Sequence, residues 1–287
     1  MILNDKTVVI TGGSEGVGAA AARLFADAGA NLMLVARTRK NLEAIADELR
    51  DRTRVEIFVM DVTDADACVD VFKKAAFEFG QIDVLVNNAG YHARGNVEDV
   101  APAELGKMVD VNFRAPIILS RIAIPYLKEN GSGVIINVGS MAGRTPVPGS
   151  TTYAATKAGL RSFSLALAEE LQASNIKVGL VSPGPIDTQF ILADIEQTAD
   201  ITLSQPMSTA DEVAQTIVDL CGNTMREVAM PRLTGMLTTV NYLFPWVGRK
   251  MRPLLEKKGR RVKESYKAEQ KRLKEKDKAE RKRRESA

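Results

Sequence analysis

Apolar residues along the chain form short, near-continuous runs that alternate with longer segments of helical periodicity. The runs lie at residues 7–11, 31–36, 54–60, 83–87, 133–138 and 177–182. Runs without strict alternation are typical of strands covered on both faces. The helical segments lie at 17–28, 39–50, 64–79, 103–129, 152–173 and 208–222. This order predicts an α/β fold: a doubly wound, Rossmann-like parallel sheet with helices on both faces.

The pattern changes after the last predicted strand. Residues 188–206 show no clear period and lie between a turn and a helix, so they are a candidate mobile lid. Farther on, the pattern predicts a C-terminal helical extension. We therefore divide the chain into a main domain at 1–231 that includes the active site, an amphipathic region at 232–262, and a basic tail at 263–287 that is helical or disordered.

Composition narrows the functional classes. With 45% hydrophobic and 26% charged residues, the chain has the composition of an ordinary globular protein. Its two cysteines, Cys68 and Cys221, lie far apart, which indicates a reducing compartment without a disulfide framework. A single histidine, His92, argues against a multi-histidine metal site. We expect no metal, and we interpret His92 as a solvated surface imidazole.

The chain has no run of about 20 apolar residues, and its N-terminal apolar run is too short for a signal peptide, so we expect a cytoplasmic protein. Charge is unevenly distributed. Residues 249–287 contain 18 lysines and arginines against 7 acidic residues, although the net charge of the whole chain is only +3. This asymmetry distinguishes a basic C-terminal segment from the rest of the chain.

The glycine-rich sequence TGGSEGVG, residues 11–18, follows the first predicted strand and opens the first helix. Its glycines allow a sharp turn and a close approach of a pyrophosphate to the N–H groups at the helix start. The alternative is a glycine turn that serves only close packing. The strand–loop–helix context favours dinucleotide binding, with contacts expected from Gly12, Ser14, Glu15, Gly16, Val17 and Gly18.

A tyrosine and a lysine, Tyr153 and Lys157, lie one helical turn apart among small residues. Residues four apart are neighbours on a helix. A nearby cation favours the phenolate and lowers the pKa of the phenol, which makes a tyrosine a usable acid near neutral pH. The alternative is a tyrosine packed in the core beside a lysine that reaches water.

An ordered set of motifs resembles the short-chain dehydrogenases/reductases over most of the chain, from residue 4 to residue 230. The set comprises TGGSEGVG, Asp61-Val62, NNAG at 87–90, Asn112 in VDVNF, INVGS at 136–140, YAATK at 153–157 and SPGPIDT at 182–188. The resemblance implies that Tyr153 is the general acid/base and that Lys157 lowers its pKa and holds the nicotinamide ribose. It further implies that Ser140 binds the substrate oxygen and that Asn112 holds a water for proton relay.

The resemblance also implies a set of cofactor contacts. Asp61 would hydrogen-bond the adenine, Val62 would pack near it, and Thr188 would lie near the carboxamide. The other implied contacts are those of Asn88, Ala89 and Gly90 with the adenosine side and of Pro183, Gly184 and Ile186 with the nicotinamide end. Two alternatives are that Asp61 only caps the next helix and that Pro183-Gly184 forms only a turn.

The end of the second predicted strand favours NADP over NAD. An NAD site needs an acid there to bind the ribose 2′-hydroxyl, whereas this chain has Arg37 and Arg39, which suit a 2′-phosphate. Two positions depart from the family pattern. Glu15 stands where many NADP-using relatives have a cation, and its charge would repel the phosphate unless it turns away or pairs with an arginine. Gly139 stands where relatives often have serine, which alters pocket room rather than the mechanism.

These residues predict an NADP-dependent oxidoreductase that reversibly reduces a ketone or aldehyde, on a lipophilic or acyl-type substrate, with a proton from Tyr153. Two other classes stay open: a catalytically silent nucleotide-binding regulatory protein, and a protein attached to a membrane or nucleic acid by its basic tail. We do not expect nucleic acid as the partner. We expect a homo-oligomer, a dimer or tetramer, formed through the helices at 103–129 and 152–173.

The amphipathic region predicts attachment to an anionic membrane surface. Apolar residues recur at helical spacing from Leu233 to Val247, with Tyr242 and Trp246 as interfacial aromatics. This uncharged stretch is too short and broken to span a bilayer, and cations follow it directly. The alternatives are a dimer-forming helix and a lid over the active site. For residues 263–287 the alternative is a solvated, charged helix.

Overall fold

The core of the molecule is a parallel sheet of mostly apolar strands. The computed structural model describes residues 2–188 and 195–285, with side chains described through residue 268 and at Arg272. Within these residues seven strands form a sheet in the order β3-β2-β1-β4-β5-β6-β7. They are β1 (Thr7–Thr11), β2 (Asn31–Ala36), β3 (Val55–Val59), β4 (Val84–Asn87), β5 (Gly133–Val138), β6 (Ile176–Pro183) and β7 (Glu227–Met230). This order confirms the predicted Rossmann-like fold.

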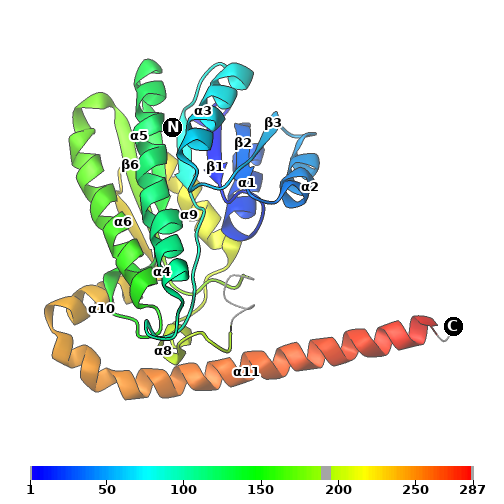
Figure 1. Ribbon diagram of the computed structural model, residues 1–287, viewed down its shortest axis with the longest axis vertical. Helices are drawn as coiled ribbons and strands as arrows, with labels where there is room; N and C mark the ends of the chain where they lie inside the picture. Colours follow the sequence, from blue (N-terminus) through cyan, green and yellow to red (C-terminus); the bar gives the residue numbers. More distant parts are fainter. Residues whose placement is uncertain (1, 189–194, 286–287) are drawn as a thin grey trace.

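Helices cover both faces of the sheet (Figure 1). One face is covered by α1 (Gly16–Asp27), α2 (Arg39–Leu49) and α9 (Ala210–Gly222), and the other by α3 (Ala65–Phe79), α5 (Ala115–Glu129) and α6 (Thr151–Glu170). Alternate residues of a strand point to opposite faces, so Val8 and Ile10 of β1 join one core while Val9 joins the other. Both sets are buried, which explains why the strands show no alternating pattern.

Two elements differ from the sequence prediction. The helix expected at 103–129 consists of α4 (Pro102–Val109) and α5, joined by a π-helical segment at Asp110–Arg114. Such segments occur frequently at functional sites, and this one contains Asn112. The sequence pattern does not predict β7, because this strand has only four residues, is partly exposed and begins with a charged residue.

The C-terminal helices pack around the edge of the sheet where the strands end. α10 (Arg232–Leu243) contacts β7 and the segment after β5, and α11 (Pro245–Glu285) contacts α8 (Asp200–Leu203) before extending past the domain (Figure 1). The expected lid includes α8, whereas its residues 189–194 lie outside the described residues. None of the helices in the described ranges has a stretch with the length and apolar content that a bilayer crossing requires.

α11 makes a close contact with α8 at Gly259. A Cβ atom on Gly259 would lie 1.6 Å from the backbone oxygen of Asp200, so no side chain fits there. One turn on, Lys263 Nζ donates to the backbone oxygens of Glu196 and Thr198 at 2.6 and 2.9 Å. The long helix therefore holds the described part of the expected lid, from residue 195 onward, against the domain.

Replacing Gly259 by alanine should separate α11 from α8, because the added methyl group cannot fit 1.6 Å from a backbone oxygen. We expect the amide hydrogens of residues 195–204 to exchange faster, as measured by hydrogen exchange with mass spectrometry. Gly106→Ala is the matched control. A Cβ atom on Gly106 meets nothing within 4 Å, and alanine favours a helix over glycine by roughly 1 kcal/mol. Unchanged exchange in Gly259→Ala would contradict the close contact.

Candidate active site

The loops that follow the strands meet at one edge of the sheet. Parallel strands bring their carboxyl ends to the same edge, where α/β proteins bind ligands. A cavity of about 1610 Å³ lies there, lined by the loops after β1 to β6 and by residues of α10 and α11. Drug-sized ligands commonly occupy ~300–1,000 Å³. The cavity therefore has room for a dinucleotide together with a substrate.

Thr11 and Asn88 join β1 and β4 at the point where the strand order reverses. Thr11 Oγ1 accepts hydrogen bonds from the backbone N–H groups of Asn88 and Ala89 at 3.0 and 3.1 Å. Asn88 Nδ2 donates to the backbone oxygens of Thr11 and Gly12 at 3.0 and 3.1 Å. These bonds fix the glycine-rich loop against the loop after β4. This role of Thr11 cannot be recognised from the sequence, because its hydroxyl is hydrogen-bonded to a loop far along the chain.

The loop after β1 requires glycine at three positions. Gly12 and Gly16 have φ angles of +66° and +52°, in the left-handed region that favours glycine. A Cβ atom on Gly18 would lie 2.0 Å from the backbone oxygen of Gly12. The tight turn leaves the N–H groups at the start of α1 facing an open cradle. Such a cradle fits the pyrophosphate of a dinucleotide.

Most of the predicted cofactor residues line the cavity. They are Gly12, Ser14, Glu15, Gly16, Val17, Arg37, Asp61, Val62, Asn88, Ala89, Gly90, Tyr153, Lys157, Pro183, Gly184, Ile186 and Thr188. Two of the predicted contacts lie elsewhere. Gly18 packs against Gly12, and Arg39 lies outside the cavity, 3.5 Å from the carboxylate of Glu43.

Asp61 is held by its own loop. Its Oδ1 accepts hydrogen bonds from the backbone N–H and the hydroxyl of Thr63, both at 2.9 Å. Asp64 caps α3 instead, by accepting from two backbone N–H groups of the first turn, so the capping alternative for Asp61 is wrong. Burial alone would raise the pKa of Asp61, but the bonds from Thr63 and the charge of Arg37 hold that pKa below its ordinary value.

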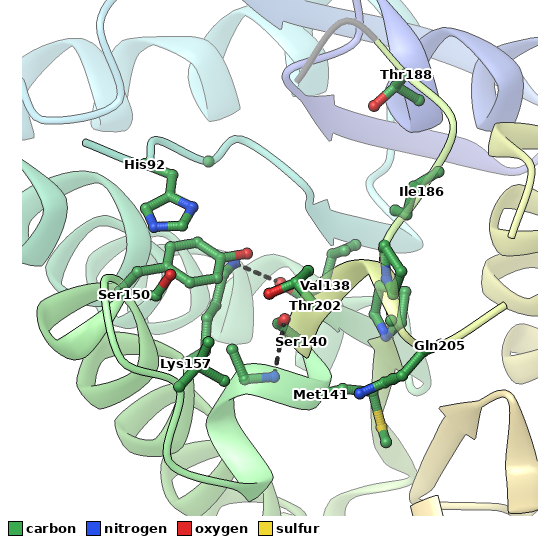
Figure 2. Close-up of a pocket in the computed structure, with 18 of the residues that line it drawn as sticks. His92, Val138, Ser140, Met141, Ser150, Lys157, Ile186, Thr188, Thr202 and Gln205 are labelled. Carbon is green, nitrogen blue, oxygen red and sulfur yellow. Dashed lines mark hydrogen bonds between the residues drawn. The ribbon is translucent and has the colours of Figure 1, made fainter. Parts of the chain in front are cut away.

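Tyr153, Lys157 and Ser140 all line the cavity. Figure 2 shows Lys157 and Ser140 on the same side of it. Tyr153 and Lys157 lie one turn apart on α6, and Lys157 Nζ is 5.8 Å from the centre of the tyrosine ring. Lys157 is buried, and its Nζ donates to the backbone oxygen of Val138 at 2.8 Å, so the alternative of a lysine that reaches water is wrong. Ser140 follows β5, and its hydroxyl is hydrogen-bonded with Tyr153.

Burial controls the protonation of this cluster. Burial raises the pKa of Tyr153, although the hydrogen bond with Ser140 and the charge of Arg94 oppose the shift. This direction is opposite to the lowering predicted from the sequence, because removing a phenolate from water has the larger effect. Burial also lowers the pKa of Lys157 to about 8. The phenol is thus protonated at neutral pH and can donate a proton.

His92 is not the solvated surface imidazole predicted from the sequence. Its ring stacks on that of Tyr153, with the ring centres 4.1 Å apart and an angle of 15° between the planes. Arg94 Nη1 lies 2.7 Å from His92 Nδ1. Burial, together with the charges of Arg94 and Lys157, lowers the pKa of His92 to about 3, so the imidazole is neutral at physiological pH. His92 and Arg94 both line the cavity, and Figure 2 shows the His92 ring at its wall.

Asn112 lies in the π-helical segment, behind the residues that line the cavity. Its Oδ1 accepts from the backbone N–H of Tyr91 at 2.8 Å, and its Nδ2 donates to the backbone oxygen of Tyr91 at 2.6 Å. The same Nδ2 donates to Thr156 Oγ1 on α6 at 3.4 Å. Asn112 thus fixes the loop after β4 to the helix that carries Tyr153 and Lys157.

Comparison with known proteins agrees with this arrangement. Residues 6–199 match the short chain dehydrogenase family. The chain belongs to that family. It is 40% identical over 187 residues to sulfoacetaldehyde reductase 2 of Chromohalobacter salexigens, covering 64% of this chain and 74% of the relative. It is also 33% identical over 192 residues to an uncharacterized oxidoreductase of Staphylococcus aureus, covering 67% of this chain and 83% of that protein.

As a short-chain dehydrogenase, the chain is an oxidoreductase of a family that uses a nicotinamide cofactor, NAD or NADP. Members of this family typically act on small molecules and form oligomers. The cradle of the glycine-rich loop fits the dinucleotide part of such a cofactor.

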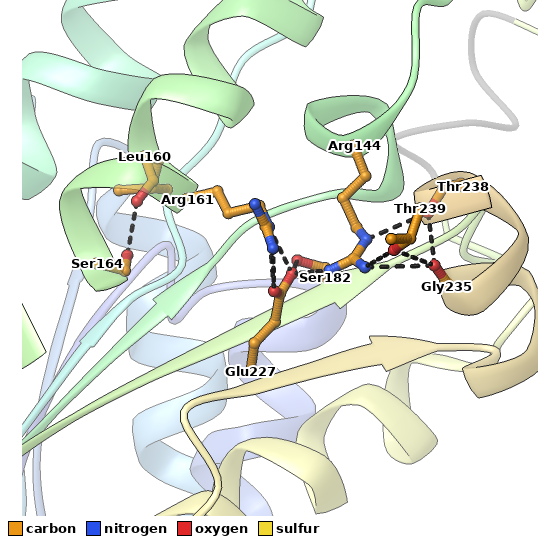
Figure 3. A network of polar contacts seen from close by, with 9 residues as sticks. All are labelled: Arg144, Leu160, Arg161, Ser164, Ser182, Glu227, Gly235, Thr238 and Thr239. Carbon is orange, nitrogen blue, oxygen red and sulfur yellow. Dashed lines mark hydrogen bonds and ion pairs between the residues drawn. The ribbon is translucent and has the colours of Figure 1, made fainter. Parts of the chain in front are cut away.

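In this short-chain dehydrogenase a mostly buried carboxylate, that of Glu227, joins the cavity loops to the last strand (Figure 3). Glu227 on β7 forms ion pairs with Arg144, which follows Ser140, and with Arg161 of α6, at 2.5 and 2.8 Å. Ser182 Oγ donates to the same carboxylate at 3.0 Å. Burial alone would raise the pKa of Glu227, but the hydrogen bonds from Arg161 and Arg144 outweigh burial and hold the pKa below its ordinary value.

Glu227→Gln should lower the free energy of unfolding by roughly 2–4 kcal/mol, because it leaves the mostly buried Arg144 without a counter-charge. The pH dependence identifies the cause. A carboxylate whose pKa is lowered by folding stabilises the protein above its ordinary pKa of 4.5, and this contribution is lost as the pH falls through the folded value. In urea unfolding, the difference in the free energy of unfolding between wild type and variant should therefore be largest at pH 7 and should decrease below pH 4.5.

Glu169→Gln is the control for this measurement. Glu169 is an exposed partner of Arg226, and exposed ion pairs contribute under about 1 kcal/mol. If Glu227→Gln has no larger effect than Glu169→Gln at pH 7, the ion pairs of Glu227 do not stabilise the fold.

Proposed function

We propose that the chain is an NADPH-dependent reductase that reversibly converts a lipophilic ketone or aldehyde to an alcohol, and that it acts as a homo-oligomer formed through α5 and α6. The observation that carries the proposal is the cluster of Tyr153, Ser140 and Lys157 beside the glycine-rich loop. A phenol that burial keeps protonated, hydrogen-bonded to a serine, is a suitable proton donor to a carbonyl oxygen.

Each residue of the cluster has its own role in this proposal. The nicotinamide cofactor, when bound, supplies the hydride that reaches the carbonyl carbon. Ser140 holds the carbonyl oxygen, and Tyr153 donates its phenolic proton to that oxygen as negative charge develops. Lys157, with a pKa of about 8, is mostly cationic at pH 7, so it stabilises the phenolate left behind and binds the ribose. The water relay through Asn112 stays a prediction.

The walls of the cavity on the substrate side support a lipophilic substrate. They consist of apolar side chains from the loop after β5 and from the C-terminal helices: Met141, Pro146, Val147, Leu237, Val240, Val247, Met251 and Leu255. A second candidate is a short anionic aldehyde. One relative is named sulfoacetaldehyde reductase 2, and Arg94 beside Tyr153 would pair with an anion near the carbonyl. We favour the lipophilic substrate because apolar residues from three elements form these walls.

Tyr153→Phe should lower NADPH-dependent reduction by about 10²–10⁴-fold, because it removes the proton donor and keeps the ring that stacks on His92. NADPH binding, measured by titration calorimetry, should be retained. The substrates tested should run from long-chain aldehydes and ketones to sulfoacetaldehyde. Near wild-type turnover by the variant would overturn the mechanism, and no wild-type turnover on any substrate would favour a catalytically silent nucleotide-binding protein.

The proposed preference for NADPH rests on Arg37. This residue follows β2, lines the cavity and makes no salt bridge within the described part of the chain. Its guanidinium is therefore available to a 2′-phosphate. Glu15 also lines the cavity, but its side chain is exposed, so solvent and salt screen its repulsion of the phosphate.

Arg37→Asp should shift the ratio of the NADPH and NADH dissociation constants toward NADH by about tenfold or more, since it removes a charge-assisted hydrogen bond and supplies a ribose acceptor. Arg39→Asp is the matched control. Arg39 lies outside the cavity and pairs with Glu43, so its replacement should leave the ratio unchanged. A wild type that binds NADH at least as tightly as NADPH, by calorimetry, would contradict the proposal.

A further inference from the structure

α10 presents its apolar side chains outward. Leu233, Met236 and Leu243 are 69%, 69% and 65% exposed, and Leu237 and Val240 are exposed beside them. These positions are three or four residues apart, so they form one stripe along the helix. A helix on the surface of a globular protein ordinarily turns such a stripe toward the core.

The inward face of α10 is polar and is held by Arg144 (Figure 3). Arg144 donates to the hydroxyls of Thr238 and Thr239 at 3.2 and 3.0 Å. It also donates to the backbone oxygen of Gly235 at 3.3 Å. Because Arg144 pairs with Glu227 as well, these bonds belong to the network around β7. The network fixes the inward face, and the apolar stripe is therefore exposed, with Leu237 and Val240 at its edge toward the cavity.

The exposed apolar surface continues through the turn into α11. The large apolar residues there are between 46% and 71% exposed. Apolar surfaces of this extent mark sites of interaction with a protein or a membrane. We call the whole surface the apolar face, and it consists of Leu233, Met236, Leu237, Val240, Tyr242, Leu243, Phe244, Trp246, Met251 and Leu254.

The charges within and around the apolar face are positive. From Pro231 to Leu255 the sequence contains no Asp or Glu, and Lys250 Nζ lies 5.8 Å from the centre of the Trp246 ring. Cations beside aromatic residues and an apolar stripe form an arrangement that binds anionic bilayer surfaces. The four cations of this stretch are exposed, and one of them also pairs with Glu256: Arg232, Arg249, Lys250 and Arg252.

A second copy of the chain fits the apolar face less well than a lipid surface does. A two-fold interface places one patch against the same patch of the other copy. Here it would bring the cations of residues 231–255 together without a carboxylate from that stretch. An anionic lipid surface offers opposite charge as well as an apolar interior. The oligomer proposed through α5 and α6 uses other surfaces.

The apolar face adjoins the cavity. Leu237, Val240, Tyr242 and Met251 belong to the apolar face and also line the cavity that contains Tyr153. A lipophilic compound dissolved in a bilayer can therefore follow apolar side chains from the lipid toward Tyr153.

We propose that the apolar face docks on the surface of an anionic membrane and that the substrate enters the cavity from the lipid. The docking rests on the surface itself. The access route rests, in addition, on the proposed reductase function with a lipophilic substrate.

Trp246 allows a direct test, because it is the only tryptophan in the chain and lies in the apolar face. The full-length protein is mixed with phosphatidylcholine vesicles that contain about 30% phosphatidylserine, at low salt. We expect a blue shift of the tryptophan emission and quenching by brominated lipids, both weaker with phosphatidylcholine alone and at high salt. Unchanged emission with the anionic vesicles would overturn the proposal. So would emission that depends on protein concentration and does not respond to vesicles, which would indicate a second copy.

A double variant separates docking from the reaction. Met236→Gln combined with Leu243→Gln changes two residues of the apolar face that do not line the cavity. It should bind the anionic vesicles at least about tenfold more weakly in co-sedimentation, with unchanged reduction of a short, water-soluble aldehyde. Phe77→Gln is the control, since Phe77 is 87% exposed on α3. Wild-type vesicle binding by the double variant, or an equal loss in Phe77→Gln, would reject the apolar face as the docking surface.

The two readouts distinguish this proposal from the proposed function. Vesicle binding without turnover on any carbonyl compound would support docking and reject the reductase. Turnover on the short aldehyde without vesicle binding would reject docking and support the reductase. When both occur, anionic vesicles should lower the KM for a long-chain aldehyde in wild type but not in the double variant, and an equal KM in both would reject the access route.

Discussion

The carboxylate of Glu227 forms ion pairs with two arginines from distant parts of the chain. The arrangement of the cavity depends on these ion pairs. Arg144 belongs to the segment after Ser140, and Arg161 belongs to the helix that carries Tyr153. Removing a mostly buried carboxylate from between two guanidinium groups carries a large penalty, because Arg144 loses its counter-charge. One residue of a short edge strand therefore positions the serine and the tyrosine relative to each other, and through Arg144 it also positions α10.

The parts of the structure that local sequence determines could be predicted. The strands of the sheet are buried on both faces, so their apolar runs are recognisable without any partner, as in β1. The glycine-rich loop is equally local, because Gly12 and Gly16 need positive φ angles wherever they stand. β7 could not be predicted, because its four residues are too few to show a pattern. Their strand conformation depends on pairing with β6 and on the ion pairs of Glu227.

The parts that depend on packing between distant residues could not be predicted. The pair Tyr153 and Lys157 is evident from its spacing, but the direction of the tyrosine pKa follows from burial, which spacing does not reveal. The stacking of His92 on Tyr153 joins segments 61 residues apart in sequence. The apolar stripe of α10 was recognisable, whereas its outward direction follows from the hydrogen bonds of Arg144.

The contact between α11 and the segment that begins at residue 195 has a mechanical consequence. Lys263 binds the backbone oxygens of Glu196 and Thr198, and Gly259 packs against Asp200. These contacts hold the helix and the segment together as one unit. The junction of α10 and α11 at Phe244 is not helical, so α11 and the segment could turn about this point relative to α10. A rotation of α11 about this point would therefore carry the described residues from 195 onward with it, so this wall of the cavity would move as one unit and not as a short loop.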